Sequence, residues 1–178
     1  MSDTSSAAPV RRVVCPGSYD PLTWGHLDVF RRAVALFDEV VVVVLVNESK
    51  RGLFSVPERL DMLAHELADV PHVRVTSFAG LLVDFCRAEQ ATAVVKGVRS
   101  GGDFGYEVQM AQMNDHLAGV QTVLLPTAPS MSFVSSSLVK EVARFGGDVS
   151  ALVPSYVLDR LRTRLQESAE RPDDQDGR

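Results

Sequence analysis

A valine-rich stretch decides the fold: Val40-Val41-Val42-Val43-Val44-Leu45-Val46. Branched apolar residues favour a strand, and a strand without polar alternation is typical of a parallel sheet that helices cover on both faces. Residues 39–47 are therefore predicted to form an inner strand of an α/β sheet. The apolar run is also far too short to span a bilayer.

Short apolar segments alternate with longer amphipathic ones on both sides of this strand. In the longer segments the apolar residues recur every three or four positions, as in helices. The other predicted strands span residues 11–15, 72–78, 92–96 and 121–125. The predicted helices span residues 25–37, 57–69, 81–89, 104–117, 136–145 and 154–166. This order predicts an α/β fold: a single-domain, Rossmann-like, doubly wound parallel five-stranded sheet with helices on both faces.

The net charge of −5 lies mostly at the two ends of the chain. Residues 169–178 carry −2 and residues 1–9 carry −1, which leaves −2 for residues 10–168. The polar composition of the arm (1–9) and of the acidic tail (169–178) predicts disorder. Residues 10–168 are predicted to form the functional domain. Because this body is nearly balanced and has no basic stripe, neither nucleic acid nor a membrane surface is an expected partner.

Targeting signals and cysteine usage point to a cytoplasmic protein. The arm lacks a charged start followed by an apolar stretch, so it does not resemble a secretory signal. The two cysteines, Cys15 and Cys86, match neither a zinc-site spacing nor a redox pair. Both are interpreted as buried apolar residues.

Hydrogen-bond donors follow several of the predicted strands, at the sheet edge where open α/β folds bind ligands. His26 enters a helix after the first strand, beside backbone N–H groups that favour a phosphate. On spacing alone His26 could equally be a capping or core histidine. Lys50 follows the second strand, Lys96 and Arg99 follow the fourth, and three consecutive serines from Ser135 follow the fifth.

Several common catalytic motifs are missing from the sequence. It contains no G-x-x-x-x-G-K-[ST] phosphate loop, no G-x-G-x-x-G fingerprint and no cluster with metal-ligand spacing. A site made only of donors suits a reaction in which an anionic substrate attacks phosphorus. Such a reaction needs no general base, and catalysis consists of positioning and charge neutralisation.

Two sets of residues resemble a known superfamily. The segment Gly17-Ser18-Tyr19-Asp20-Pro21-Leu22-Thr23-Trp24-Gly25-His26 resembles the G-[ST]-F-D-x-x-T-x-G-H element of nucleotidylyltransferases. The segments 96–114, 132–142 and 147–149 are similar to those of bacterial phosphopantetheine adenylyltransferases. The similarity covers roughly residues 13–165, so residues 10–168 are interpreted as a nucleotidylyltransferase domain.

The resemblance implies transfer of AMP from ATP to 4′-phosphopantetheine, which gives dephospho-CoA and pyrophosphate. It implies Mg²⁺ bound mainly through the ATP phosphates with no metal ligand from the chain, CoA as a feedback inhibitor, and a homo-oligomer, expected to be a hexamer. The residues matching catalytic positions are His26, Lys50 and Arg99. The residues matching ATP-binding positions are Ser18, Tyr19, His26, Gly97, Val98, Arg99, Glu107, Met131, Ser132, Phe133, Val134, Ser135, Ser136 and Ser137. The residues matching phosphopantetheine-binding positions are Ser18, Lys50, Leu82 and Lys96.

Two alternatives stay open at this stage. The same T-x-G-H chemistry serves cytidylyltransferases and nicotinamide-mononucleotide adenylyltransferases. The fold would also serve a nucleotide-binding module without turnover. The 96–114 block argues against the first, and the presence of His26, Lys50 and Arg99 argues against the second.

Overall fold

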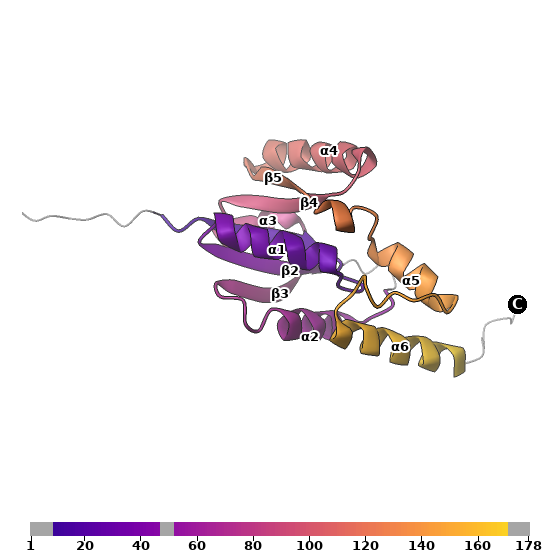
Figure 1. The fold of residues 1–178 in the computed structure, drawn as a ribbon. Coiled ribbons are helices and arrows are strands. Elements are labelled where there is room, and N and C mark those ends of the chain that lie inside the picture. The colour runs from indigo at the N-terminus through magenta and orange to yellow at the C-terminus, as the bar shows by residue number, and fades with distance from the viewer. Residues whose placement is uncertain (1–8, 47–51, 171–178) are drawn as a thin grey trace, which may run out of the picture.

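The sheet consists of five parallel strands in the order β3-β2-β1-β4-β5 (Figure 1). The computed structural model describes residues 9–46 and 52–170. The strands are β1 (Arg12–Gly17), β2 (Glu39–Val46), β3 (Val73–Ala79), β4 (Ala93–Val98) and β5 (Gln121–Pro126). The α-helices are α1 (Trp24–Leu36), α2 (Val56–Glu66), α3 (Leu82–Ala88), α4 (Gly101–Ala118), α5 (Ser136–Arg144) and α6 (Ser155–Glu170), with a 3₁₀ turn at η1 (Pro129–Met131). The predicted doubly wound α/β fold is confirmed.

Alternate residues of β2 pack into two separate cores, one on each face of the sheet. Val40, Val42 and Val44 belong to the larger core, to which α1, α2, α5 and α6 contribute. Val41 and Val43 belong to the smaller core, formed largely with α3. Figure 1 shows α1 in front of the strands and α3 behind them. Burial on both faces explains why this strand has no polar side chain in its interior.

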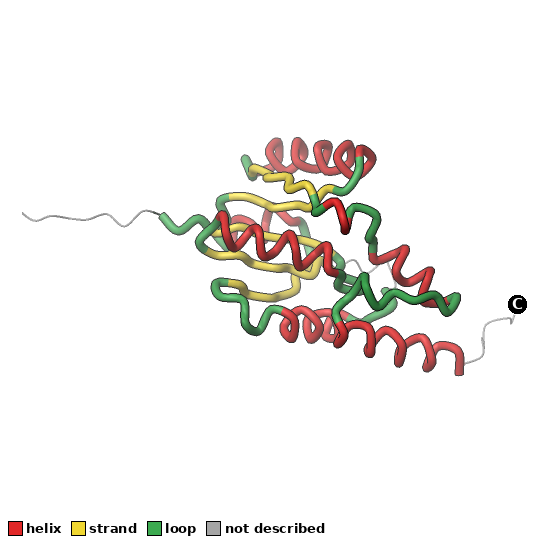
Figure 2. Tube along the Cα trace, in the orientation of Figure 1, coloured by secondary structure: helices red, strands yellow, loops and turns green. Residues whose placement is uncertain are grey.

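The strand order reverses between β1 and β4. The chain runs outward from β1 to β3 and then returns to place β4 on the other side of β1. The loops leaving β1, β4 and β5 therefore diverge at one edge of the sheet, and Figure 2 shows them on the side where α5 lies. In open α/β sheets this reversal point is where ligands bind.

Several element boundaries differ from the prediction by a few residues, and three of them lie at the site. Helix α4 begins at Gly101 and not at residue 104, because the Ser100 side chain caps it by accepting a hydrogen bond from the Asp103 amide at 3.3 Å. Gly101 and Gly102 thus belong to the first helical turn. Strands β1 and β4 continue to Gly17 and Val98, since parallel pairing with β2 and β5 extends past the apolar runs.

The two predicted ends lie largely beyond the described part of the chain. Residues 1–8 and 171–178 fall outside the described residues, as does the end of the predicted second strand at residue 47. Helix α6 continues through Glu170, which is two residues into the segment predicted as a tail.

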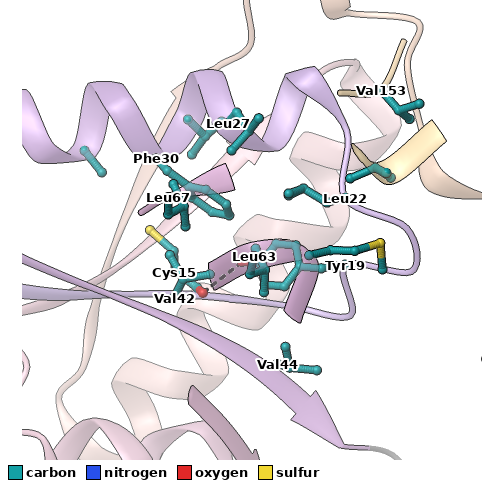
Figure 3. Packing of buried hydrophobic residues seen from close by; sticks show 14 of the residues in the cluster. Cys15, Tyr19, Leu22, Leu27, Phe30, Val42, Val44, Leu63, Leu67 and Val153 are labelled. Atoms are coloured by element: carbon teal, nitrogen blue, oxygen red, sulfur yellow. Dashed lines mark hydrogen bonds between the residues drawn. The ribbon is translucent and has the colours of Figure 1, made fainter. Parts of the chain in front are cut away.

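Tyr19 is part of the larger core although it lies beside the predicted phosphate loop. Its side chain is buried, and its hydroxyl donates a hydrogen bond to the Cys15 carbonyl at 2.8 Å (Figure 3). The ring packs edge-on against Phe30 with 5.4 Å between centroids. A buried tyrosine with a satisfied hydroxyl is a stable anchor for the loop that follows β1.

Gly97 is required where β4 passes under α1. A Cβ atom at this position would lie 2.7 Å from Cγ2 of Val29. We expect Gly97→Ala to lower the free energy of unfolding by about 1–3 kcal/mol, the usual cost of overpacking. Urea unfolding followed by the fluorescence of Trp24, the only tryptophan, measures this change.

The matched control is Gly101→Ala, because a Cβ there would have no described atom within 4 Å. It adds the same methyl group to the first turn of α4, where alanine is favourable. Equal stability of the two variants would contradict the packing argument for Gly97.

Candidate active site

A cavity of about 310 Å³ opens at the carboxyl ends of β1 and β4. It is lined by the loop after β1, by His26 of α1, by the end of β4, by the first turns of α4, and by the residues that begin α5. These segments are far apart in sequence, and the reversal of strand order brings them together. The cavity lies at the sheet edge that the sequence predicted for a ligand.

His26 is held in the first turn of α1 with a defined protonation state. Its Nδ1 accepts a hydrogen bond from the Thr23 backbone N–H at 3.1 Å and lies 3.0 Å from the Thr23 hydroxyl. A backbone N–H can only donate, so Nδ1 carries no proton and the imidazole proton is on Nε2. The ring also packs edge-on against Tyr19, with 5.2 Å between centroids. His26 therefore presents one N–H donor to the cavity.

Burial, together with the smaller effects of the positive charges of Arg99 and Lys96, lowers the pKa of His26 from 6.5 to about 4. The imidazole is uncharged at neutral pH as a result. It can donate a hydrogen bond to a phosphate oxygen without taking up or releasing a proton.

The two cations at the end of β4 are paired with carboxylates of α4. Lys96 Nζ lies 3.1 Å from Glu107 Oε1. Arg99 donates from Nε and Nη2 to the two oxygens of Asp103, at 2.7 and 3.1 Å, and from Nη1 to the Val134 carbonyl at 2.9 Å. The hydrogen bond and charge of Arg99 hold the pKa of Asp103 below its usual value.

These pairs correct one expectation from the sequence. The site was expected to contain donors only, yet Asp103 and Glu107 line the same cavity as Lys96 and Arg99. The two carboxylates neutralise the two cations, so the described part of the cavity is close to electrically balanced. An anionic ligand would have to share these cations with the α4 carboxylates or displace them.

Three consecutive serines mark the start of α5. Ser135 caps the helix by accepting from the Leu138 amide at 3.1 Å, and Ser136 Oγ donates to the Pro21 carbonyl at 2.7 Å. The Ser137 side chain also lines the cavity. The first amides of a helix bind anions well, because they have no partner within the helix and lie at the positive end of its dipole.

Most of the predicted site residues line this cavity. They are Ser18, Tyr19, His26, Lys96, Gly97, Arg99, Glu107, Val134, Ser135, Ser136 and Ser137. Val98, Leu82, Met131, Ser132 and Phe133 do not line it. Leu82 packs partly against the smaller core and Met131 against the larger one. Lys50 lies outside the described residues.

Two residues that shape the site are not among the predicted site residues. Thr23 fixes the tautomer of His26, and its signals in the sequence are a hydroxyl in the loop before His26 and its place in the T-x-G-H element. Asp103 holds the Arg99 side chain, and its spacing of four residues from Arg99 was the available signal. The sequence does not show that residue 103 lies in a helix that aims it at the cavity.

The carboxylates of the site do not form a metal centre. Within residues 9–46 and 52–170, no group of three or more His, Cys, Asp or Glu side chains is arranged to hold a metal ion. Asp103 and Glu107 are each paired with a cation.

Within residues 9–46 and 52–170, no helix is both long enough and apolar enough to cross a membrane.

The protonation state of His26 predicts an unusual titration. We expect the imidazole to stay neutral, with its proton on Nε2, as the pH falls to about 5. Because the folded-state pKa is below the unfolded value, the unfolded chain binds the proton first. His26 therefore makes folding less favourable as the pH falls from 6.5 towards 4.

Nitrogen-15 NMR of the histidine side chains measures both the tautomer and the midpoint, with His26→Ala as the control that assigns the signal. A midpoint near 6.5, or a proton on Nδ1, would contradict the geometry.

The comparisons with known proteins identify the family. The sequence profile of the cytidylyltransferase-like family matches residues 14–142. The phosphopantetheine adenylyltransferase of Streptomyces coelicolor is 56% identical over 157 residues, which cover 88% of this chain and 99% of the relative. The protein of the same name from a Nocardioides species is 60% identical over 154 residues, which cover 86% of this chain and 97% of the relative. The chain thus belongs to the cytidylyltransferase-like family, and within it to the phosphopantetheine adenylyltransferases.

Proposed function

We propose that this chain transfers AMP from ATP to 4′-phosphopantetheine, forming dephospho-CoA and pyrophosphate. One structural observation carries the proposal: an uncharged, N–H-donating His26 faces a cavity that also contains Lys96, Arg99 and the start of α5. The names of the relatives supply the two substrates.

In this reaction a phosphate oxygen of phosphopantetheine attacks the α-phosphorus of ATP. A new P–O bond forms, the bond from the α-phosphorus to the bridging oxygen breaks, and pyrophosphate leaves with the electron pair. The nucleophile is already an anion, so no general base is required. The chain contributes positioning, together with charge stabilisation at the phosphate oxygens.

His26 is proposed to donate from Nε2 to a non-bridging oxygen of the α-phosphate, where negative charge grows in the transition state. The remaining ATP phosphates are proposed to be held by Arg99, by Ser18 in the loop between β1 and α1, and by the first amides of α5. Lys96, with Lys50 and Leu82 from the family resemblance, is proposed to bind the acceptor. Met131, Ser132, Phe133 and Val98 are retained as proposed ATP contacts from the same resemblance.

Mg²⁺ is proposed to enter the site bound to the phosphates of ATP. The described residues that could contribute, Asp103 and Glu107, are already occupied by Arg99 and Lys96. When bound, the ion would neutralise phosphate charge. The steps assigned above to His26 and Arg99 do not depend on it.

The substrate pair is tested by measuring pyrophosphate release. ATP and CTP are each combined with phosphopantetheine, glycerol 3-phosphate or nicotinamide mononucleotide. We expect turnover only with ATP and phosphopantetheine. Activity with another pair alone would replace the proposal by the corresponding nucleotidylyltransferase, and ATP binding without any turnover would favour a non-catalytic module.

A homo-oligomer is proposed from the exposed side chains of α4, and the expected subunit number of six comes from the family resemblance. This helix exposes five large apolar side chains, Phe104, Tyr106, Met110, Met113 and Leu117. Apolar side chains gathered on one element commonly mark a protein interface. Sedimentation equilibrium tests the assembly.

Feedback inhibition by CoA and a cytoplasmic location are proposed from the family resemblance. Adding CoA to the pyrophosphate assay tests the feedback inhibition.

A further inference from the structure

Asp20 is a buried carboxylate for which the proposed reaction has no direct use. It is 5% exposed and lies in the loop between β1 and α1, two residues after Ser18. It does not line the cavity. A buried charge is costly unless it is paired and hydrogen-bonded, so its partners indicate what it does.

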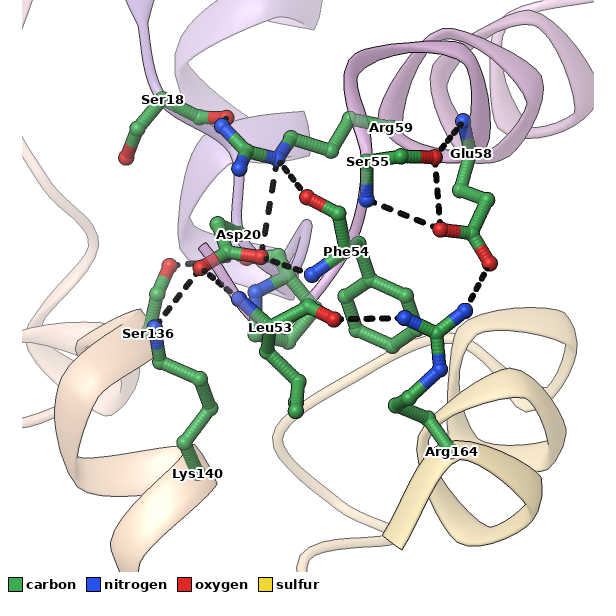
Figure 4. Close-up of polar contacts among 11 residues, drawn as sticks. Ser18, Asp20, Leu53, Phe54, Ser55, Glu58, Arg59, Ser136, Lys140 and Arg164 are labelled. Carbon is green, nitrogen blue, oxygen red and sulfur yellow. Dashed lines mark hydrogen bonds and ion pairs between the residues drawn. The ribbon is translucent and has the colours of Figure 1, made fainter. Parts of the chain in front are cut away.

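Each oxygen of Asp20 accepts hydrogen bonds from other parts of the chain (Figure 4). Oδ1 accepts from the Phe54 amide at 2.8 Å, and Oδ2 accepts from the Leu53 amide at 3.0 Å. Oδ2 also accepts from Lys140 Nζ of α5 at 2.8 Å, while Arg59 Nε of α2 lies 3.6 Å from Oδ1. One carboxylate thus joins the loop between β1 and α1 to the segment before α2, to α2 itself and to α5.

Neighbouring contacts close the same cluster. Ser136, the first residue of α5, donates to the Pro21 carbonyl at 2.7 Å. Arg59 donates to the Ser18 carbonyl at 3.3 Å and to the Phe54 carbonyl at 2.8 Å. The loop that carries Ser18 and the helix that begins with Ser136 are therefore connected directly through Ser136, which lines the cavity, and indirectly through Asp20 and Lys140, which do not.

Asp20 holds these partners as an anion. Burial alone would raise the pKa of Asp20, but the hydrogen bonds from Lys140, Phe54 and Leu53 and the charge of Lys140 lower it below its usual value. Hydrogen bonds to an ionised acceptor are roughly twice as strong as those between neutral groups. An uncharged side chain of the same size would hold these three donors, and the nearby Arg59 guanidinium, less firmly.

We propose that Asp20 is a positioning residue that sets the distance between the Ser18 loop and the start of α5. The proposal rests on the proposed function, because both elements are assigned there to the phosphates of ATP. Asp20 contacts no substrate. It acts by fixing the groups that do, and it also holds the backbone of residues 53 and 54.

Asp20→Asn tests this role, because asparagine keeps the shape and removes the charge. We expect kcat to fall by about a hundredfold, the scale expected when reacting groups are displaced by about 1 Å. The KM for ATP and the dissociation constant of ATP are expected to rise only several-fold, since every ATP-binding group is still present. A purely structural role would lower the melting temperature and leave kcat per folded molecule unchanged.

Glu58→Gln is the matched control. Glu58 accepts from the Ser55 amide at 2.8 Å and pairs with Arg164, which donates to the Leu53 carbonyl at 2.7 Å. It supports the same segment from the opposite side but has no contact with the first loop. We expect Glu58→Gln to lose stability and to keep kcat close to that of the unchanged protein. Equal losses of kcat in the two variants would overturn the proposal.

Lys140→Met keeps the test decisive if Asp20→Asn does not fold, since it removes only the link to α5. It is expected to lower kcat by a smaller factor, in the same direction. A normal kcat in Asp20→Asn would overturn the positioning role. If Asp20→Asn does not fold, a normal kcat in Lys140→Met would overturn it.

The two proposals fail in different ways. An inactive wild-type protein with ATP and phosphopantetheine would overturn the proposed function. Asp20 would then be judged by ATP calorimetry, in which Asp20→Asn, and not Glu58→Gln, should bind ATP several-fold more weakly. Unchanged ATP affinity in Asp20→Asn would overturn the positioning role in that case.

Discussion

Replacing His26 by alanine is expected to lower kcat by about 10²–10³-fold, the usual cost of removing one preorganised donor from a site of developing charge. The dissociation constant of ATP is expected to change far less. The reason is that the Nε2–H bond should strengthen as charge builds on the α-phosphate oxygens, so it stabilises the transition state more than the bound substrate. Steady-state kinetics and ATP calorimetry on the same preparations measure the two quantities.

His65→Ala is the matched control for this experiment. His65 is an exposed histidine of α2 whose ring stacks on Tyr156 of α6 at 3.9 Å between centroids. Its removal takes away an imidazole without touching the cavity, so kcat should remain close to normal. Near-normal turnover in His26→Ala would contradict the role assigned to that residue. Equal losses of kcat and ATP affinity would mean that His26 binds substrate and transition state alike.

Much of the fold could be predicted because its signals are local. The unbroken valine stretch of β2 requires burial on both faces, and its alternate residues do pack into two cores. The helix predicted to begin at residue 57 is confirmed as α2, and a capping box between Ser55 and Glu58 marks its start. The start of α4 was placed three residues too late, because glycines favour turns and the cap at Ser100 was not recognised.

The candidate site was predictable in part, for a related reason. Parallel strands bring the residues at their carboxyl ends to one edge, so His26, Lys96 and Arg99 could be grouped without a structure. The pairing of Lys96 with Glu107 and of Arg99 with Asp103 depends on how α4 lies over the end of β4. The cluster around Asp20 joins positions more than a hundred residues apart in sequence, in the case of Lys140. Such contacts follow from tertiary packing and leave no periodic signal.

The second large effect on kcat is expected from replacing Arg99. Its guanidinium reaches the Asp103 carboxylate and the Val134 carbonyl at once, so its planar fork stands between α4 and the loop before α5. Arg99→Met removes both the charge and the fork. We expect kcat to fall by about 10²-fold or more, because cationic clamps on a transferring phosphoryl group act mainly on the transition state. Arg99→Lys keeps the charge and loses the fork. Its kcat should therefore lie between that of Arg99→Met and that of the unchanged protein.

The same substitution has a second consequence that can be measured without substrate. The charge of Arg99 helps to lower the pKa of His26, so Arg99→Met should raise that pKa from about 4 towards 6.5, with Asp103 left unpaired beside it. The NMR titration of His26 measures this change. An unchanged titration would show that the two residues are not electrostatically coupled.

Arg87→Met is the control for both readouts. Arg87 lies in α3 and makes a similar set of contacts, to the Asp84 carboxylate at 3.3 Å and to the Leu117 carbonyl at 3.2 Å, but it does not line the cavity. Its removal should leave kcat and the His26 titration unchanged. If Arg87→Met and Arg99→Met lower kcat equally, the effect of Arg99 comes from lost folding contacts. If only Arg99→Met lowers kcat and raises the pKa of His26, the charge at residue 99 acts on the ATP phosphates and on the imidazole of His26.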